Sequence, residues 1–238
     1  MFRSAFLKAQ FALLLQKYGG VNSLSEEAGK WLYRNSVSIG LEKNLDEPDP
    51  KIECDLKYTL KPASPLDIEE MVQKIKDEGT EAVRYLVMGK WFYDHGLRNC
   101  YVAREQNTRE LCYIQWLISR RDAETGSIVF KSSYTYQRLG DFDIQYDNGY
   151  TFTNYRGKKL ATAIKTNLFQ IAREQGFKRV VIYVAPKNIA SLVSCYRVGF
   201  KPFEQIKIKV FCLVTRRWVI PLPANTPVEY LLPAKQAT

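Results

Sequence analysis

The chain has 238 residues, of which 46% are hydrophobic and 13% aromatic, so it can bury a substantial core and is not an intrinsically disordered protein. Its formal net charge of +10 suits an anionic ligand, a nucleic acid or an anionic membrane surface, and the charge alone does not choose among them. No apolar run is long enough to span a bilayer as a helix.

The five cysteines are widely spaced, and their number is odd. They form no Cys-x-x-Cys pair, which argues against a disulfide framework and against a zinc site. We therefore expect reduced thiols, no bound metal and a cytoplasmic location.

Residues 1–50 are predicted to be an N-terminal helical extension followed by a linker. A first helix is expected over 2–18, ended by a Gly-Gly pair, and a second short helix over 25–34. The acidic, proline-containing stretch 46–50 is typical of a linker. For the extension we favour packing on the domain or homodimer formation over contact with a membrane surface, because its polar face is not rich in lysine or arginine.

Residues 51–220 show alternating strand and helix patterns, and residues 221–238 form a proline-containing, irregular tail. The expected elements in chain order are a strand over 52–60, helices over 67–76 and 81–94, strands over 101–104 and 111–119, an irregular stretch over 121–142, a strand over 143–152, a helix over 158–175, a strand over 179–185, a helix over 188–198, and one or two strands within 203–219 with a turn at Arg216-Arg217. The nearly unbroken apolar run over 179–185 is typical of a central strand covered on both faces. This order predicts an α/β fold in which a central mixed sheet is flanked by helices.

The turn between the strand ending near 152 and the helix after it carries the clearest chemical signal. Asn154 or Thr153 is placed to cap that helix. The first N–H groups of a helix lack partners within it and carry the positive end of the helix dipole. With the basic side chains of Arg156, Lys158 and Lys159 beside them, they predict a site for a phosphate or pyrophosphate.

The stretch Arg156-Gly157-Lys158-Lys159-Leu160-Ala161 resembles the Arg/Gln-x-x-Gly-x-Gly/Ala signature of the GNAT superfamily, the acyl-CoA-dependent N-acyltransferases. The resemblance implies a GNAT-like fold and binding of the coenzyme A pyrophosphate by this turn. Lys159 stands where the family usually has glycine. Because a residue entering a right-handed helix does not need glycine's freedom, we expect lysine to be tolerated there.

Residues 188–200 resemble the family's second signature, Asn-x-x-Ala/Ser...Tyr-x-x-x-Gly-Phe. We match Asn188, Ala190 or Ser191, Tyr196 and the pair Gly199-Phe200 to it. By this resemblance, Asn188 and Ser191 contact the pantetheine arm of coenzyme A, and the strand end from Tyr150 to Thr153, including Phe152, pairs with its amides.

The resemblance implies an N-acetyltransferase that moves an acetyl group from acetyl-CoA, or another acyl group from its CoA thioester, to a primary amine by direct attack. Tyr196 is the expected general acid for the leaving thiolate. Asp143 and Asp147, which share one face of a strand, are the candidates for the general base. Solvated carboxylates at a sheet edge remain an equal alternative for both.

The expected acceptor is a small-molecule or peptide amine, and its identity stays open. The alternative function is a non-catalytic acyl-CoA-binding or regulatory module on the same fold, motivated by Lys159 and by the lack of a clear base. We expect no nucleic-acid partner, because no RNA- or DNA-binding motif accompanies the positive charge.

Overall fold

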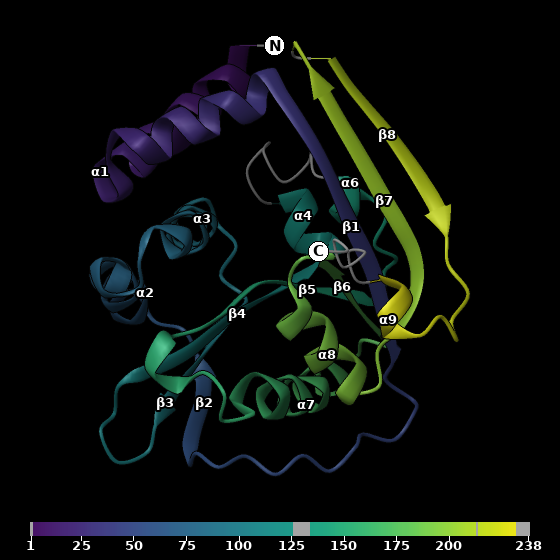
Figure 1. Cartoon of the computed structure of the whole chain (residues 1–238). Helices are drawn as coiled ribbons and strands as arrows, with labels where there is room; N and C mark the ends of the chain where they lie inside the picture. Colours follow the sequence, from purple (N-terminus) through teal and green to yellow (C-terminus); the bar gives the residue numbers. More distant parts are fainter. Residues whose placement is uncertain (1, 126–133, 213, 232–238) are drawn as a thin grey trace, which may run out of the picture.

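The protein is described here by a computed structural model covering residues 2–125, 134–212 and 214–231 (Figure 1). The strands are β1 (Tyr33–Asn44), β2 (Tyr58–Pro62), β3 (Cys100–Glu105), β4 (Leu111–Ser119), β5 (Asp143–Thr151), β6 (Arg179–Val184), β7 (Lys201–Phe211) and β8 (Val214–Pro221). The helices are α1 (Phe2–Leu32), α2 (Pro65–Gln73), η1 (Lys74–Asp77), α3 (Thr80–Asp94), α4 (Arg120–Thr125), α6 (Tyr134–Gln137), η2 (Thr153–Tyr155), α7 (Leu160–Glu174), α8 (Ile189–Arg197) and α9 (Val228–Leu231). Part of the predicted irregular stretch, 126–133, lies outside the described residues.

The described strands form one sheet in the order β2-β3-β4-β5-β6-β1-β7-β8. Only β5 and β6 pair in parallel, and the other described neighbours are antiparallel. Helices α1 to α3 lie on one side of this sheet, and α7 and α8 lie on the other (Figure 1). The predicted α/β fold with a mixed sheet between helices is therefore confirmed.

The strand β1 corrects our division of the chain at residue 50. It lies between β6 and β7, pairing with β6 over residues 39–44 and with β7 over residues 33–42, and Ile39 and Leu41 within it are fully buried. The predicted helix over 25–34 ends at Leu32, and the chain passes directly into this strand. Residues 1–50 thus supply a central strand rather than an extension alone. The Gly-Gly pair does break α1, because Gly20 has a φ of +71°.

Two other expectations about strands were wrong. The predicted turn at Arg216-Arg217 lies inside β8, and the β7–β8 hairpin turns after Phe211 instead. The predicted strand over 52–60 is shorter than expected, since β2 begins at Tyr58. Within the tail, residues 228–231 form the short helix α9.

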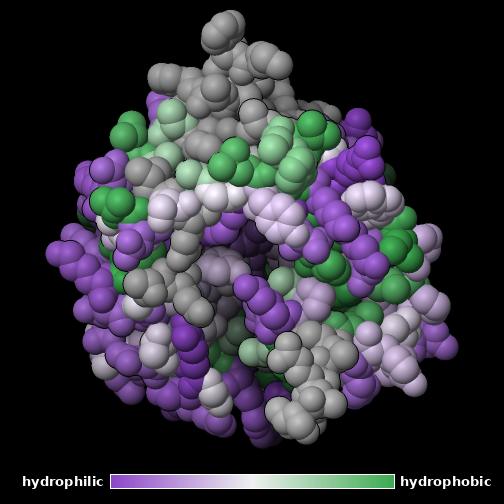
Figure 2. Space-filling view, turned by 45° about the horizontal axis from the view of Figure 1, so that its top comes forward, coloured by the Kyte–Doolittle hydropathy of each residue, from purple (hydrophilic) through white to green (hydrophobic). Residues whose placement is uncertain are grey.

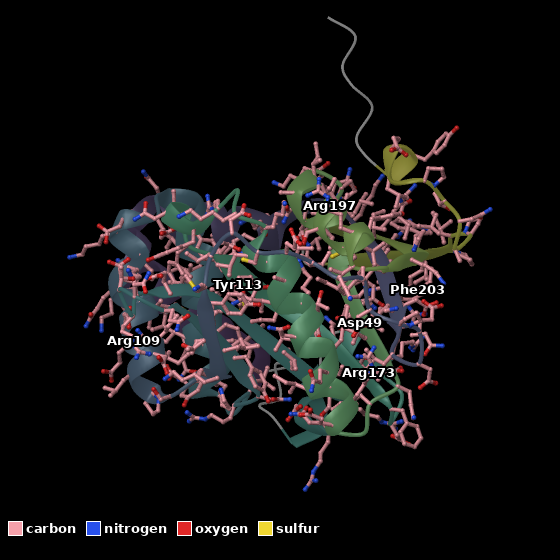
Figure 3. The ribbon with its side chains drawn as sticks, turned by 90° about the horizontal axis from the view of Figure 1, so that it is seen from below. Asp49, Arg109, Tyr113, Arg173, Arg197 and Phe203 are labelled. Atoms are coloured by element: carbon pink, nitrogen blue, oxygen red, sulfur yellow. The ribbon has the colours of Figure 1, made fainter. Side chains whose placement is uncertain are left out.

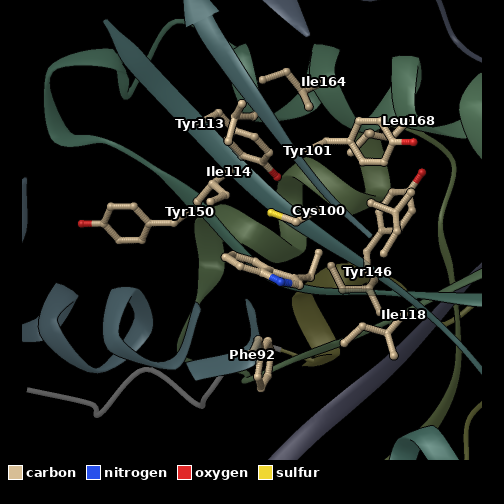
Figure 4. Close-up of a cluster of buried hydrophobic side chains, with 14 of the residues drawn as sticks. Phe92, Cys100, Tyr101, Tyr113, Ile114, Ile118, Tyr146, Tyr150, Ile164 and Leu168 are labelled. Carbon is tan, nitrogen blue, oxygen red and sulfur yellow. The ribbon is translucent and has the colours of Figure 1, made fainter. Parts of the chain in front are cut away.

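The core lies on both faces of the sheet, and aromatic rings hold the layers together (Figure 4). Tyr146 of β5 stacks on Phe169 of α7 with ring centroids 5.9 Å apart, and Trp116 of β4 meets Phe92 of α3 edge-on at 6.0 Å. One face of the molecule has a hollow at its centre (Figure 2). Hydrophilic residues surround much of the opening of this hollow.

The linker after β1 is fastened to α7. Arg173 forms an ion pair with Asp49 at 2.5 Å and donates to the carbonyl of Leu45 at 2.7 Å, and both charged residues are labelled in Figure 3. This contact fixes the long connection between β1 and β2 against the helix that begins at the predicted phosphate turn.

None of the described helices is long and apolar enough to cross a membrane. Within the described residues, no group of three or more His, Cys, Asp or Glu side chains is arranged to hold a metal ion.

Candidate functional site

The predicted phosphate turn lies between the end of β5 and the start of α7. The capping prediction was wrong: Thr153 and Asn154 belong to η2, and the residue that caps α7 is Lys159, whose side chain makes no capping hydrogen bond. Lys159 has a φ of +57°, and Gly157 has a φ of +78°. Our expectation that lysine enters the helix without strain is thereby corrected, because the left-handed region favours glycine.

Five consecutive amides are left without partners in this turn. The N–H groups of residues 157–161 donate to no protein acceptor within the described part of the chain, whereas the next two, of Thr162 and Ala163, donate to the carbonyl of Lys159. The predicted residues Leu160 and Ala161 open α7 and so add the positive end of its dipole. A cluster of unpaired amides at a helix start fits the pyrophosphate of coenzyme A.

The basic side chains around these amides are held in different ways. Arg156 donates to the carbonyl of Thr151 at 3.0 Å and to the hydroxyl of Tyr150 at 2.7 Å. Lys158 lies over the ring of Tyr155, with its ammonium nitrogen 5.4 Å from the ring centroid. Lys159 is exposed and makes no ion pair among the described residues. Lys159 therefore gives the turn a positive charge that no carboxylate of the described residues pairs with.

Glu78, which our sequence reasoning missed, fixes the end of β5. This carboxylate precedes α3 and accepts hydrogen bonds from the amide of Thr153 at 3.0 Å and from the hydroxyl of Tyr150 at 2.7 Å. It also lies 3.7 Å from Arg156. Burial and the bond to Glu78 raise the pKa of Tyr150. No local sequence pattern could have predicted this contact, because 75 residues separate Glu78 from Thr153.

Strands β5 and β6 separate near their carboxyl ends. Their parallel pairing ends at Tyr146 and Ile182, after which β5 continues beside β4 and β6 continues beside β1. The β4–β5 register shifts where Asn148 and Gly149 of β5 face the single residue Gln115 of β4, and Asn148 in this bulge has a φ of +48°. The bulge bends β5 away from β6 and opens a wedge between two central strands.

The buried side chain of Gln115 fills the bulge. Its amide nitrogen donates to the carbonyl of Asp147 at 2.6 Å, and its oxygen accepts from the hydroxyl of Tyr113 at 2.7 Å. A Cβ at Gly149 would lie 2.3 Å from this oxygen and 3.0 Å from the Tyr113 hydroxyl, so any larger residue there would displace the side chain of Gln115. The phenol of Tyr113 is thus held in the interior, beside the bulge of β5.

Asp147 lies at the edge of the wedge and faces α6. Its carboxylate accepts from the hydroxyl of Tyr136 at 2.5 Å, from the side chain of Gln145 at 3.2 Å and from the amide of Asn148 at 2.6 Å. Burial raises the pKa of Asp147, although these three donors partly oppose the shift. A carboxylate with a raised pKa is suited to accept a proton near neutral pH.

Asp143, the other predicted base, lies at the opposite end of β5. It forms an ion pair with Arg179 of β6 at 2.5 Å and accepts from the amide of Gly140 at 2.7 Å. Burial by itself would raise the pKa of Asp143, but the bonds from Arg179 and Gly140 outweigh it and lower the pKa. Asp143 therefore links the starts of β5 and β6, and its carboxylate lies far from the wedge.

The second signature lies on α8, where Asn188 is the N-cap and its side chain accepts from the amide of Ser191 at 3.2 Å. Tyr196 points elsewhere: its hydroxyl donates to the carbonyl of Thr226 at 3.0 Å, and burial raises its pKa to about 12. The match of Tyr196 to the signature is therefore corrected. The signature has three residues between tyrosine and glycine, and that spacing before Gly199 falls on Cys195.

Cys195 is fully buried on the side of α8 that faces the sheet. Burial raises the pKa of its thiol, as is usual for a cysteine that packs in a core. The phenol of Tyr113 is close enough for Cys195 to influence its pKa, which burial and Cys195 both raise. The ring of Tyr113 on β4 lies within the cluster of buried side chains drawn in Figure 4.

Of the remaining predicted cofactor residues, Phe152 is buried, and its amide donates to the carbonyl of Cys112 at 3.1 Å. The structure therefore brings the turn at 156–161, the strand end at 150–152 and Asp147 to the same end of β5, while Asp143 and the hydroxyl of Tyr196 lie apart from it.

The family model of the acetyltransferase (GNAT) domain matches residues 57–201, which is more than half of the chain. Three similar solved structures are the GCN5-related glucosamine N-acetyltransferase region of a fungal multi-domain GH3 β-N-acetylglucosaminidase, the GCN5-related N-acetyltransferase from Sphaerobacter thermophilus and a GNAT-family acetyltransferase from Colwellia psychrerythraea. Their identities to this chain are 14%, 15% and 11%, with TM-scores of 0.52, 0.50 and 0.50.

The alignments cover 79%, 86% and 86% of this chain and 23%, 58% and 62% of those chains, respectively. The chain thus spans less than two thirds of each of these three. No curated protein matches the sequence.

Proposed function

Because the chain belongs to the GNAT acetyltransferase family, we propose that it transfers an acyl group from acyl-CoA to a primary amine, with acetyl-CoA as the expected donor. The observation that carries this proposal is the row of five unpaired amides over 157–161, at the start of α7 and beside the wedge between β5 and β6. The amides bind the pyrophosphate, and Arg156, Lys158 and Lys159 balance its charge.

Acyl-CoA supplies the acyl group as a thioester, and the wedge leads from the phosphate turn to Asp147. In the transfer, the amine nitrogen forms a bond to the acyl carbon and the carbon–sulfur bond breaks. Asp147 accepts the proton that the amine loses, directly or through water. The pKa of Asp147 is raised by burial, so it holds that proton better than an exposed carboxylate does.

The leaving thiolate needs a hydrogen-bond donor, and Tyr113 is a phenol beside the bulge of β5. Tyr196, our first candidate, uses its hydroxyl on the carbonyl of Thr226 in the described structure. The hydroxyl of Tyr113 also donates a hydrogen bond, to Gln115, but it lies beside Gly149 in the bulge of β5, whereas that of Tyr196 lies on the segment after β8. We propose Tyr113 for the role of general acid on the ground of this position and keep Tyr196 as the alternative. Both phenols have raised pKa values, so each keeps its proton at neutral pH.

A thiol-release assay tests the proposal with acetyl-CoA and a panel of amino sugars, amino acids, polyamines and peptides. Amino sugars are included because one structurally similar region is named a glucosamine N-acetyltransferase. We expect turnover with one class of amine, a loss of about 100-fold in kcat for Tyr113→Phe, and little change for Tyr196→Phe. The opposite order of the two variants would restore Tyr196 as the acid.

The second candidate is a non-catalytic acyl-CoA-binding module, favoured by the bulky Lys159 side chain in a left-handed position within the phosphate turn. Binding of coenzyme A together with no thiol release from any amine of the panel would support it. A panel in which neither binding nor release occurs would contradict both candidates.

A further inference from the structure

The net charge of +10 is not explained by the phosphate turn, and much of the excess lies on the far end of the sheet. Residues 33–38 of β1, 205–211 of β7 and 214–220 of β8 are adjacent in the sheet and contain no aspartate or glutamate. They carry the cations Arg34, Lys207, Lys209, Arg216 and Arg217.

The strand register arranges one face of this region in levels. Tyr33, Phe211 and Val214 are opposite one another at the end of the three strands. Two residues further along each strand, the next level holds Asn35, Lys209 and Arg216. The level after that holds Val37, Lys207 and Trp218. Residues two apart on a strand share a face, so these side chains form one continuous surface.

The outermost level is apolar and open to solvent. Leu32, Tyr33, Phe211 and Val214 are 60%, 65%, 69% and 63% exposed, and we call these four residues the hairpin tip. Leu32 belongs to it because its carbonyl accepts from the amide of Cys212 at 2.8 Å in the hairpin turn. Turns are ordinarily polar, whereas Phe211 to Val214 includes no polar or charged residue other than a cysteine. Such a cluster of exposed apolar side chains marks a contact surface.

The cations stand directly behind this tip. Lys209 and Arg216 are exposed, make no ion pair among the described residues, and lie two residues inward from Phe211 and Val214. Two residues along a strand correspond to roughly 7 Å. Trp218, 43% exposed, lies one level further in.

We propose that the hairpin tip and the cations behind it dock this protein on an anionic bilayer surface. The apolar side chains enter the boundary between headgroups and acyl chains, to a depth of about 5–10 Å. Lys209 and Arg216 then lie at the level of the lipid phosphates, and Trp218 lies near the outer headgroups. The order along the strands, apolar first and cationic next, follows the order of layers in a membrane interface.

Charge complementarity favours lipid over a second copy of the chain. A symmetric dimer through this surface brings Lys209 and Arg216 toward their own copies with no carboxylate to offset them. An anionic bilayer supplies the missing negative charge and also receives the apolar tip.

Cosedimentation of the full chain with vesicles tests the proposal. One set contains phosphatidylcholine alone, and the other contains about 30% phosphatidylglycerol. We expect binding to the anionic vesicles, binding that weakens as salt is raised, and little binding to the neutral ones. Failure to bind the anionic vesicles, or equal binding to both sets, would overturn the proposal.

Two variants with matched controls locate the surface. Phe211→Ser/Val214→Ser and Lys209→Glu/Arg216→Glu are each expected to weaken vesicle binding about tenfold or more. Phe142→Ser/Tyr230→Ser removes two other apolar side chains, 64% and 81% exposed, and is expected to bind like the wild type. Lys51→Glu/Arg197→Glu is the control for the change in charge.

Equal binding of the tip variant and its control would contradict the assignment. Sedimentation velocity on the same proteins provides the second readout. A concentration-dependent dimer that the tip variant abolishes would assign the surface to a second copy instead and overturn the proposal. Neither pair includes a residue of the proposed acyl-transfer site, so loss of vesicle binding with unchanged thiol release separates the two functions.

Discussion

Lys159 holds a left-handed backbone at the entrance to α7, with a φ of +57°. The family signature has glycine at this position, and the geometry supplies a physical reason, since a side chain in this conformation costs roughly 1–2 kcal/mol. The lysine gives the turn an additional positive charge near the unpaired amides. Lys159 therefore lowers the stability of the folded chain but adds a positive charge to the phosphate turn.

We predict that Lys159→Gly raises the free energy of unfolding by about 1 kcal/mol, because glycine adopts this conformation without the steric penalty. Urea denaturation measures the change. The matched control is Lys158→Gly, next to it in a conformation with negative φ, which is expected to lower stability through added chain entropy. Equal effects of the two variants would contradict a strained backbone at Lys159.

The raised pKa of Asp147 determines how the proposed reaction is expected to depend on pH. Its pKa is raised, so the ionised form needed for a base is reached only above the ordinary range of a carboxyl group. We expect kcat/KM to fall as pH is lowered through this raised pKa and Asp147→Asn to abolish that acid limb along with most of the activity. A limb that persists in Asp147→Asn would assign the base to another group.

The same shift has a consequence for stability. A carboxyl whose folded pKa is raised binds its proton more tightly in the folded state, so its contribution to stability is present below the unfolded pKa. That contribution is lost as pH rises through the folded pKa.

Among the elements, the end of β5 depends on Glu78, which reaches it from the segment before α3. We predict that Glu78→Ala lowers the free energy of unfolding by about 1–3 kcal/mol, because it leaves the hydroxyl of Tyr150 and the amide of Thr153 without their acceptor. Asp77→Ala, at the exposed neighbouring position, is the control and is expected to change stability little. A Glu78→Ala protein as stable as this control would contradict the role of the carboxylate.

Elements with a strong local pattern could be predicted from the sequence. The amphipathic helix α7, the apolar strand β6 and the pair β3–β4 lie within one or two residues of their expected bounds. The bulge of β5 opposite Gln115 and the contact of Glu78 with Thr153 could not, because both depend on residues brought together only by the fold. The tyrosine of the second signature was misplaced by one residue, which on a helix rotates a side chain by about 100°.

At the scale of the whole molecule, the sheet is completed by the N-terminal strand β1. A polar-rich strand with Arg34, Asn35, Ser36 and Ser38 gives a weak strand signal, which is why residues 33–44 were not recognised as part of the sheet. Its central position follows from its partners β6 and β7, both more than 130 residues later in the chain.

We predict that Leu41→Ala in β1 lowers the free energy of unfolding by about 2–5 kcal/mol, because Leu41 is fully buried and its loss leaves a cavity. Leu13→Ala, at a residue of α1 that is 64% exposed, is expected to change stability by less than about 0.5 kcal/mol. A small effect of Leu41→Ala in urea denaturation would mean that β1 does not contribute to the core.

The central claim is that the start of α7 binds the pyrophosphate of acyl-CoA, and isothermal titration of coenzyme A and acetyl-CoA tests it most directly. The informative variant is Ala161→Pro, which removes one of the five unpaired N–H groups in the first turn of a helix, where proline is tolerated. We predict that the wild type binds both ligands and that this variant, folded normally by urea denaturation, binds them about tenfold more weakly. A wild type that binds neither ligand, or a variant that binds as tightly as the wild type, would contradict the claim.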